Sequence, residues 1–184
     1  LGMNMNMVAN EAFLDTASVR SSVVSHAKTL GYTPNSVRAP IAFVNVTLNN
    51  IGNLTSATIP VGTVFTTVID DVNYQFVTVA EHSTQIENGI ISFTNLPIYE
   101  GTYVTNRYTV DVDNVDQKFY VNDENGDTTT LIVDVFDNSS STSSTTFTLA
   151  TDTTQTASDS NVYFLQESED GKFEIYFGDG IIGK

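Results

Sequence analysis

The hydrophobic pattern predicts helices at one end of the chain only. Within residues 10–32, apolar positions recur every three or four residues, which places them on one face of a helix; they are Phe13, Ala17, Val24, Ala27 and Leu30. Thr16 and Ser18 are better suited to helix N-caps than to helix interiors. The pattern therefore predicts two short helices, over residues 11–16 and 18–30.

This helical segment has two interpretations. In the first, its apolar face packs on the protein's own sheet, as in most surface helices of globular proteins. In the second, the segment docks on a partner chain, and the candidate interface residues are then Phe13, Val24, Ala27 and Leu30. The sequence leaves both interpretations open.

From residue 39 onward the apolar period changes from about 3.6 residues to two. In residues 41–48, Val44, Val46 and Leu48 share one face, which predicts a strand with a buried face. Other short runs of β-forming residues follow, separated by turn signals such as Asp70-Asp71: 55–59, 64–69, 74–80, 90–93, 103–112, 118–121, 131–136, 145–150, 162–166 and 173–177.

Strands at such short intervals are typical of sandwiches and barrels rather than of alternating strand and helix units. We therefore expect an α+β, mainly β fold, in which a short N-terminal helical segment precedes antiparallel β-sandwich or barrel-like units. The expected organisation is a helical arm over residues 1–38, a β domain over 39–110 and a second β unit over 111–184.

The second unit contains the only compositionally biased segment of the chain. About two-thirds of residues 138–160 are Ser or Thr. One interpretation is an edge hairpin with a solvated tip. The other is a loop that becomes ordered only against a neighbouring subunit.

Charge limits the partners of this protein. The chain carries a net charge of −15, and nucleic acids and anionic membranes are bound by basic patches, so we expect neither as a partner. The charge is also uneven: residues 1–40 hold two acids and three bases, whereas residues 41–184 hold twenty acids and four bases. The arm is therefore electrically distinct from the acidic β region. The chain has no cysteine, which excludes disulfides and thiol chemistry.

Two acidic groups have some features of cation sites. Residues 123–127 (DENGD) place oxygen ligands like the start of a calcium loop, but Gly126 is misplaced for an EF-hand and position twelve is Asp134. An Asn-Gly pair between two β runs is the stronger signal, and it predicts a hairpin. The second group, Asp111, Asp113 and Asp116, is more typical of a solvated acidic face. We therefore predict no metal site.

The remaining motifs give no catalytic constellation. Gly178 and Gly183, followed by Lys184, have the spacing of a phosphate loop, but no Ser or Thr follows and an aromatic strand precedes them, so a tight β-turn is favoured. His26 and His82 fall on different elements without further clustered ligands. The chain has no Gly-x-Ser-x-Gly elbow. We expect no enzymatic activity, no cofactor and no small-molecule substrate.

An ordered set of motifs resembles a known family. Near the N-terminus these are EAFLDTA at 11–17 and RSSVVSHAKTLGYTP at 20–34, and near the C-terminus they are VYFLQE at 162–167 and FEIYFGDGIIGK at 173–184. IPVGTVF at 59–65 and IYEG at 98–101 lie between them. In this order the motifs resemble the baseplate wedge proteins of T4-like contractile-tail phages, the baseplate J-like family.

The resemblance implies a structural role in the virion. The intact protein would help to form the inner ring of the tail baseplate, pair with a second copy of itself as a homodimer, and contact other wedge proteins. The ring would change conformation and pass the contraction trigger to the sheath. Assembly would take place in the host cytoplasm.

Family members are several times longer than this chain, which begins at Leu1 and ends directly after a motif. We therefore expect an internal piece of a longer protein. Composition alone leaves a second function open, because an acidic, cysteine-free, Ser- and Thr-rich β protein also suits a surface-binding or adhesin module. The basic amphipathic arm favours assembly, since an adhesin domain needs no such helix.

Overall fold

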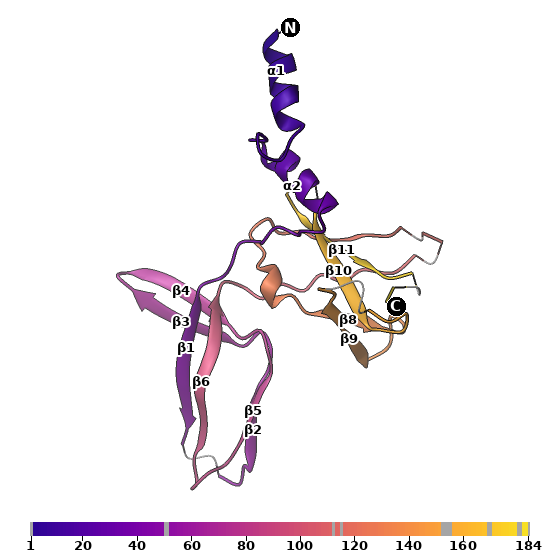
Figure 1. Cartoon of the computed structure of the whole chain (residues 1–184). Coiled ribbons are helices and arrows are strands. Elements are labelled where there is room, and N and C mark those ends of the chain that lie inside the picture. Colours follow the sequence, from indigo (N-terminus) through magenta and orange to yellow (C-terminus); the bar gives the residue numbers. More distant parts are fainter. Residues whose placement is uncertain are drawn as a thin grey trace. The chain divides into compact units, whose positions relative to one another are not determined.

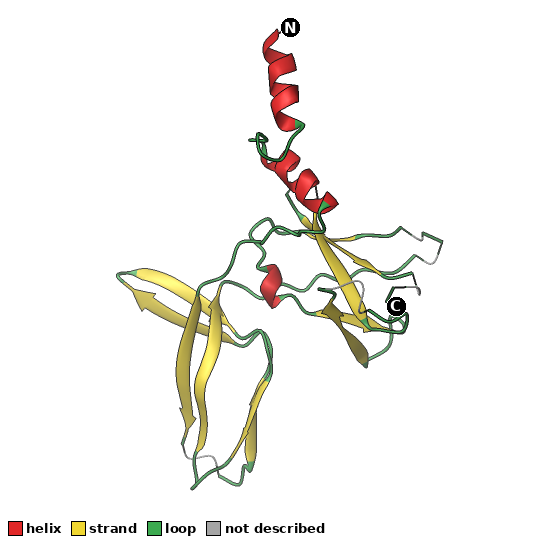
Figure 2. Ribbon diagram, in the orientation of Figure 1, coloured by secondary structure: helices red, strands yellow, loops and turns green. Residues whose placement is uncertain are grey.

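The computed structural model describes residues 2–49, 52–111, 113–114, 116–151, 156–168, 171–179 and 182–183 (Figure 1). The chain divides into two compact units. One is Arg38–Asn106, and the other combines Leu1–Val37 with Arg107–Lys184. Strands predominate and two α-helices precede them (Figure 2), which confirms a mainly β fold with a helical N-terminal segment.

The unit Arg38–Asn106 contains two sheets. The larger has the strand order β1-β6-β4-β3, formed by Ile41–Leu48, Ile91–Glu100, Val72–Val77 and Val64–Ile69. The smaller pairs β2 (Ser56–Ile59) with β5 (His82–Gln85). All of these pairings are antiparallel. Strand β5 was not predicted, because its sequence HSTQ lacks the apolar alternation that marks a strand.

The core of the larger sheet comes mainly from its second strand. Four β6 residues are buried and share one face, namely Ile91, Phe93, Leu96 and Ile98. Val44 and Val46 of β1 lie opposite Leu96 and Phe93 and are half-buried. The prediction that Leu48 is buried on this face of β1 is wrong, because Leu48 is exposed at the end of the strand. Ile41 and Phe43, on the other face, are also exposed.

A two-residue turn joins β3 to β4. Asp70 and Asp71 have positive φ values of 50° and 63°, the backbone that a two-residue hairpin needs to match the twist of its strands. Asn and Gly are favoured in such turns because positive φ strains most residues that carry a Cβ. The predicted turn is confirmed. Its two residues have a strained backbone and carry adjacent carboxylates.

The other unit is built on one five-stranded sheet. Its strand order is β7-β11-β10-β9-β8, formed by Phe119–Val121, Phe173–Phe177, Val162–Glu167, Ser144–Leu149 and Val133–Phe136. The buried core residues are Phe119, Phe147, Tyr163 and Ile175. The rings of Phe119 and Phe147 lie edge-on to that of Phe177, at centroid distances of 5.7 and 5.4 Å, an arrangement that aromatic quadrupoles favour. Burial in this core raises the pKa of the Tyr163 hydroxyl.

The pairing in this sheet departs from the prediction at three places. Strands β9 and β10 are parallel, with Val162 opposite Thr148. The hairpin predicted at Asn125-Gly126 is wrong, since β7 and β8 lie at opposite edges of the sheet and the 3₁₀-helix Thr128–Thr130 intervenes. The antiparallel β8–β9 hairpin does lie at an edge, as one interpretation of the Ser- and Thr-rich segment expected.

The strand predicted over residues 103–112 is absent from the described part of that run. Side chains take the hydrogen bonds that a neighbouring strand would supply: the amide of Asp111 donates to Gln117 Oε1, and Gln117 Nε2 donates to the Thr109 carbonyl. The hydroxyl of Tyr108 donates to the carbonyl of Tyr120. The segment is therefore extended but unpaired. Val112 lies outside the described residues.

The helices are α1 (Gly2–Glu11) and α2 (Arg20–Thr29). Helix α2 agrees with the helix predicted over residues 18–30. The helix predicted over residues 11–16 is wrong, because α1 ends at Glu11, where that helix was expected to begin. Met and Ala are strong helix formers, so residues before Glu11 sustain a helix without a clear apolar face. A turn ends it, in which the hydroxyl of Thr16 donates to the Asn10 carbonyl. Among the described residues, neither helix is long and apolar enough to cross a membrane.

Replacing Asp70-Asp71 with Asn-Gly should raise the free energy of unfolding of this unit by about 0.5–1 kcal/mol. Gly relieves the positive-φ strain, and the change removes two adjacent like charges. Urea denaturation measures the gain. The control Asp71→Ala removes one charge but keeps a Cβ at positive φ, so it should not stabilise. An equal gain in both variants would contradict the backbone explanation.

Candidate functional site

One carboxylate joins the two helices of the arm. Val19, the N-cap residue of α2, makes no side-chain cap. Instead, Glu11 at the end of α1 accepts hydrogen bonds from the Ser18 amide at 3.0 Å, the Ser18 hydroxyl at 2.8 Å and the Val19 amide at 3.2 Å. A negative charge at a helix N-terminus is favourable, because the first amides lack partners in the helix. These donors, Ser18 foremost, lower the pKa of Glu11 to about 2.

A second contact holds the same two helices together. Nε2 of His26, in the last turns of α2, lies 3.0 Å from the Glu11 carbonyl oxygen. Both the backbone and the side chain of Glu11 are therefore engaged by α2 and the turn before it. This places His26 inside the arm, as a contact between helices.

An ion pair then fixes α2 to the five-stranded sheet. Arg20 Nε donates to Glu167 Oε1 at 3.0 Å, and Arg20 Nη2 donates to Glu167 Oε2 at 2.8 Å. Glu167 is the last residue of β10 and only 1% exposed. Burying a lone carboxylate is costly, and a planar guanidinium that pairs with both oxygens offsets much of that cost. The first residue of α2 is thus the charged partner that a buried acid in the sheet requires.

The sheet buries a second acid that is neutralised from within. Lys118 Nζ lies 2.9 Å from Glu174 Oε1, and Gln166 Nε2 donates to the same oxygen. The hydrogen bond that Lys118 donates to Glu174 raises the pKa of Lys118. Lys118 immediately precedes β7, the strand that pairs with Glu174's own strand. Glu174 therefore ties neighbouring strands together, whereas Glu167 ties the sheet to the arm.

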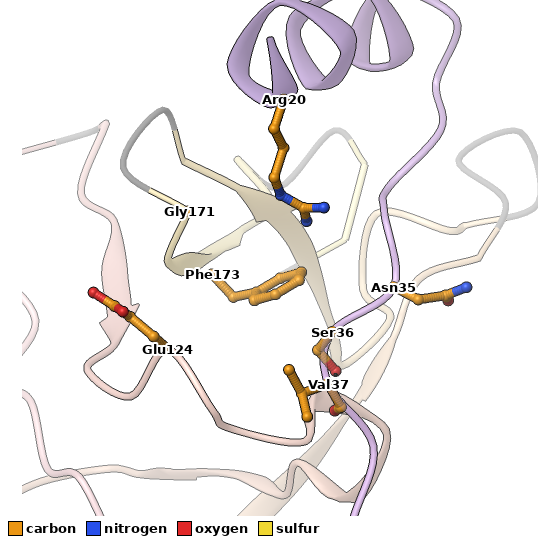
Figure 3. Close-up of a pocket in the computed structure, with 7 residues that line it drawn as sticks. All are labelled: Arg20, Asn35, Ser36, Val37, Glu124, Gly171 and Phe173. Atoms are coloured by element: carbon orange, nitrogen blue, oxygen red, sulfur yellow. Dashed lines mark hydrogen bonds between the residues drawn. The ribbon is translucent and has the colours of Figure 1, made fainter. Parts of the chain in front are cut away.

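The segment after α2 is also attached to the sheet. The hydroxyl of Thr33 donates to the Leu165 carbonyl, and Ser36 Oγ is 2.9 Å from both the amide nitrogen and Oγ1 of Thr128. A shallow pocket lies along this line and is lined by Arg20, Asn35, Ser36, Val37, Glu124, Gly171 and Phe173. Figure 3 shows Arg20 pointing from α2 toward the ring of Phe173, across from Ser36 and Val37. The pocket lies at the boundary between the arm and the sheet. The guanidinium of Arg20 that lines it is already paired with Glu167.

The four predicted interface residues divide into two pairs. Val24 is buried, at 5% exposure, and Ala27 is half-buried. Phe13 and Leu30 are 68% and 71% exposed. Other large apolar residues of the arm are exposed as well: Met5, Met7, Val8, Leu14 and Tyr32. Those on α1 are not among the predicted residues, although the helix propensity of Met was a signal for that helix.

The acidic motifs shape turns. Asp123 Oδ1 accepts from the Asn125 amide, and Asp127 Oδ1 accepts from the amide and hydroxyl of Thr129. Asp111 Oδ1 likewise accepts from the Asp113 amide. In the part of the chain that the structure describes, no three His, Cys, Asp or Glu side chains gather as metal ligands. Asp134 of β8 accepts a hydrogen bond from Thr146 of β9.

The glycine motif near the C-terminus allows close backbone approach. A Cβ on Gly178 would overlap the carbonyl oxygens of Ile182 and Gly183, and the amide of Gly183 donates to the Ala157 carbonyl. Gly178 is therefore required by packing at this fold-back. Gly180, Ile181 and Lys184 lie outside the described residues. His82, the other histidine, lies on β5 opposite Ile59.

The chain is distantly similar to a known protein. No protein-family model matches this chain. The chain is 29% identical, over 191 residues, to the baseplate wedge protein gp6 of Enterobacteria phage T4. The match covers 96% of this chain and 26% of that protein, so the chain spans about a quarter of the length of its curated relative. With so little of the chain unmatched, the similarity extends into both structural units.

Arg20→Ala should lower the free energy of unfolding of the unit that contains it by about 1–3 kcal/mol. The loss is expected to be smaller than for a fully buried pair, because the Arg20 side chain is largely exposed. Urea denaturation of Arg20→Ala, Glu167→Gln and the double variant gives the coupling between the two side chains. Arg20→Lys should recover part of the loss, since lysine cannot form the two-pronged contact. A coupling energy near zero would contradict the proposed anchor.

Glu11 should keep its charge well below the ordinary titration range of a glutamate. Its folded-state pKa is lowered, so its stabilising contribution is present above the unfolded-state pKa and is lost as the pH falls toward about 2. The amide resonances of Ser18 and Val19 should therefore shift with a midpoint near pH 2, as measured by NMR. In Glu11→Gln these shifts should disappear. A midpoint near 4.3, the ordinary glutamate pKa, would show that the carboxylate does not cap α2.

Proposed function

We propose that this chain is a structural part of a phage tail baseplate. The observation that carries the proposal is the similarity to a baseplate wedge protein along 96% of the chain. The anchored arm with exposed apolar side chains is independent support. A monomeric protein seldom leaves so many apolar side chains exposed in one segment. The proposed setting is the virion.

A finer assignment extends this proposal. In our proposal the intact protein forms part of the inner baseplate ring, associates with a second copy of itself and contacts other wedge proteins. It takes part in the conformational change that triggers sheath contraction. Assembly occurs in the host cytoplasm, and the protein needs no cofactor, nucleic acid, membrane or substrate.

The geometry of the arm suits docking. Arg20 and Glu11 fix α2 and α1 through polar contacts, which leaves Phe13 and Leu30 outside the core. An apolar side chain of this size contributes about 1.5–3 kcal/mol when it is transferred from water into an interface. A partner that covers both would therefore gain several kcal/mol, while the polar contacts keep the arm in place.

In our proposal this chain carries no catalysis. Among the described residues, shifted pKa values are found for Glu11, Lys118 and Tyr163. They belong to a helix cap, a buried ion pair and an aromatic core. Each shift has a structural cause, and a catalytic site would need such groups in one cleft with a nucleophile or an acid–base pair.

Sedimentation equilibrium tests the docking role of the arm. The variant Phe13→Ser with Leu30→Ser should weaken self-association at least about tenfold, because two apolar side chains leave the interface. The matched control, Leu54→Ser with Val110→Ser, removes two exposed apolar side chains outside the arm. Far-UV circular dichroism should retain its β-type signal in both variants.

Two outcomes would contradict this proposal. If the chain stays monomeric at tens of micromolar, the proposed self-association is wrong. The surface-binding alternative predicts such a monomer. Loss of the β signal in the double variant would make the arm a core element of its own unit.

A further inference from the structure

The outer edge of strand β1 is open. In the described chain β1 pairs with β6 alone and ends the four-stranded sheet. The amide of Glu100 donates to the Pro40 carbonyl, so Pro40 and Glu100 form a hydrogen-bonded pair. Backbone groups alternate in direction along an antiparallel strand. Those of Ala42 therefore point toward β6, and those of Ile41 and Phe43 point out of the sheet.

This edge lacks the charges that usually protect an edge strand, and its one irregularity is a shift in the pairing with β6 between Val44 and Val46. Natural edge strands carry charges or prolines that discourage pairing with another chain. Strand β1 (IAFVNVTL) has neither along its eight residues. It also begins a run of 31 residues, 39–69, without a single Asp, Glu, Lys or Arg. In a chain with a net charge of −15, two copies repel each other least along such a run.

On the face beside the edge, the two rows nearest the start of β1 are apolar; they are exposed on the edge strands and buried at Val77. Cross-strand pairing aligns Ile41 with Tyr99, Tyr99 with Val77, and Val77 with Val64. Phe43 lies opposite Pro97 in the next row of this face. Ile41 and Phe43 are 51% and 62% exposed, on the outermost strand. A strand added at this edge would therefore continue an apolar face.

We propose that β1 pairs antiparallel with β1 of a second copy, which joins two four-stranded sheets into one. This deepens the proposed assembly role and rests on it for the choice of a second copy. An antiparallel pair of identical strands is closed by a two-fold axis, so both edges are covered at once. Each uncharged strand meets an uncharged strand, and the outward amides and carbonyls gain partners without burying a charge.

The test uses proline at the edge. Phe43→Pro removes an amide that points out of the sheet and leaves the β1–β6 hydrogen bonds intact, as proline in an edge strand allows. Each dimer loses two hydrogen bonds, so its dissociation constant should rise about tenfold or more. Phe43→Ala keeps the amide and separates the contribution of the ring. Sedimentation equilibrium measures all three proteins.

The opposite edge provides a matched control. Thr66 lies on β3, the other end strand, and the amide of Thr78 donates to the Thr63 carbonyl. By the same alternation the backbone of Thr66 points outward. Thr66→Pro thus makes the same chemical change at the other edge and should leave the dimer unchanged. Nearly equal circular dichroism spectra show that both variants are folded.

A distance measurement covers the case in which Phe43→Pro fails to fold. The chain has no cysteine, so a spin label on Thr47→Cys is the only one in each copy. Paired β1 strands should bring two labels within about 30 Å, since eight residues at about 3.3 Å each span less than that. A longer distance in the dimer overturns the proposal.

The outcomes separate this inference from the assembly role. A dimer that survives Phe43→Pro but dissociates with Phe13→Ser and Leu30→Ser overturns edge pairing and leaves assembly through the arm. Equal weakening by Thr66→Pro also overturns it. A monomer at every concentration overturns both edge pairing and self-association. Selective weakening by Phe43→Pro, with the short label distance, supports it.

Discussion

The buried carboxylate of Glu167 is the constraint on which the position of the arm depends. A charge at 1% exposure needs a charged partner with matching geometry. Arg20 meets that need from the first residue of α2. The helix cannot leave the sheet without leaving this acid unpaired. Glu11 extends the constraint, because its contacts to Ser18 and Val19 hold α1 against the start of α2. Two carboxylates therefore orient a segment that has few apolar contacts of its own.

Polar anchoring leaves apolar side chains for other contacts. In most surface helices the apolar stripe is consumed by the core. Here Val24 alone of the predicted face is fully buried, while Phe13 and Leu30 remain exposed. The charge distribution divides the chain in a similar way. Acidic residues dominate after residue 40 but are absent from residues 41–69, which include β1 and β3. Repulsion between copies is therefore weakest where the backbone edge of the sheet is open.

Period-two patterning was sufficient for most strands. Strands β1, β3 and β11 agree with prediction at both ends, because apolar alternation and turn residues delimit them. Patterning could not show that Gln117 would satisfy the backbone of residues 109–111 in place of a strand. It also could not reveal the parallel β9–β10 pair, which depends on where the chain returns. Of the candidate site, Phe13 and Leu30 are exposed, and their place in an interface stays a prediction. The Arg20–Glu167 pair joins residues 147 positions apart, and no local signal links them.

The two proposed contacts differ in kind, and this difference matters for assembly. Pairing of β1 with its copy is closed by a two-fold axis, so it ends at a dimer. It uses backbone groups and an uncharged strand. Docking through Phe13 and Leu30 uses side chains, and it can reach a surface of different sequence. A subunit with both contacts can pair with one copy through β1 and reach a further copy, or another protein, through the arm. A ring built from paired subunits needs that combination, because a closed dimer interface alone cannot extend the assembly.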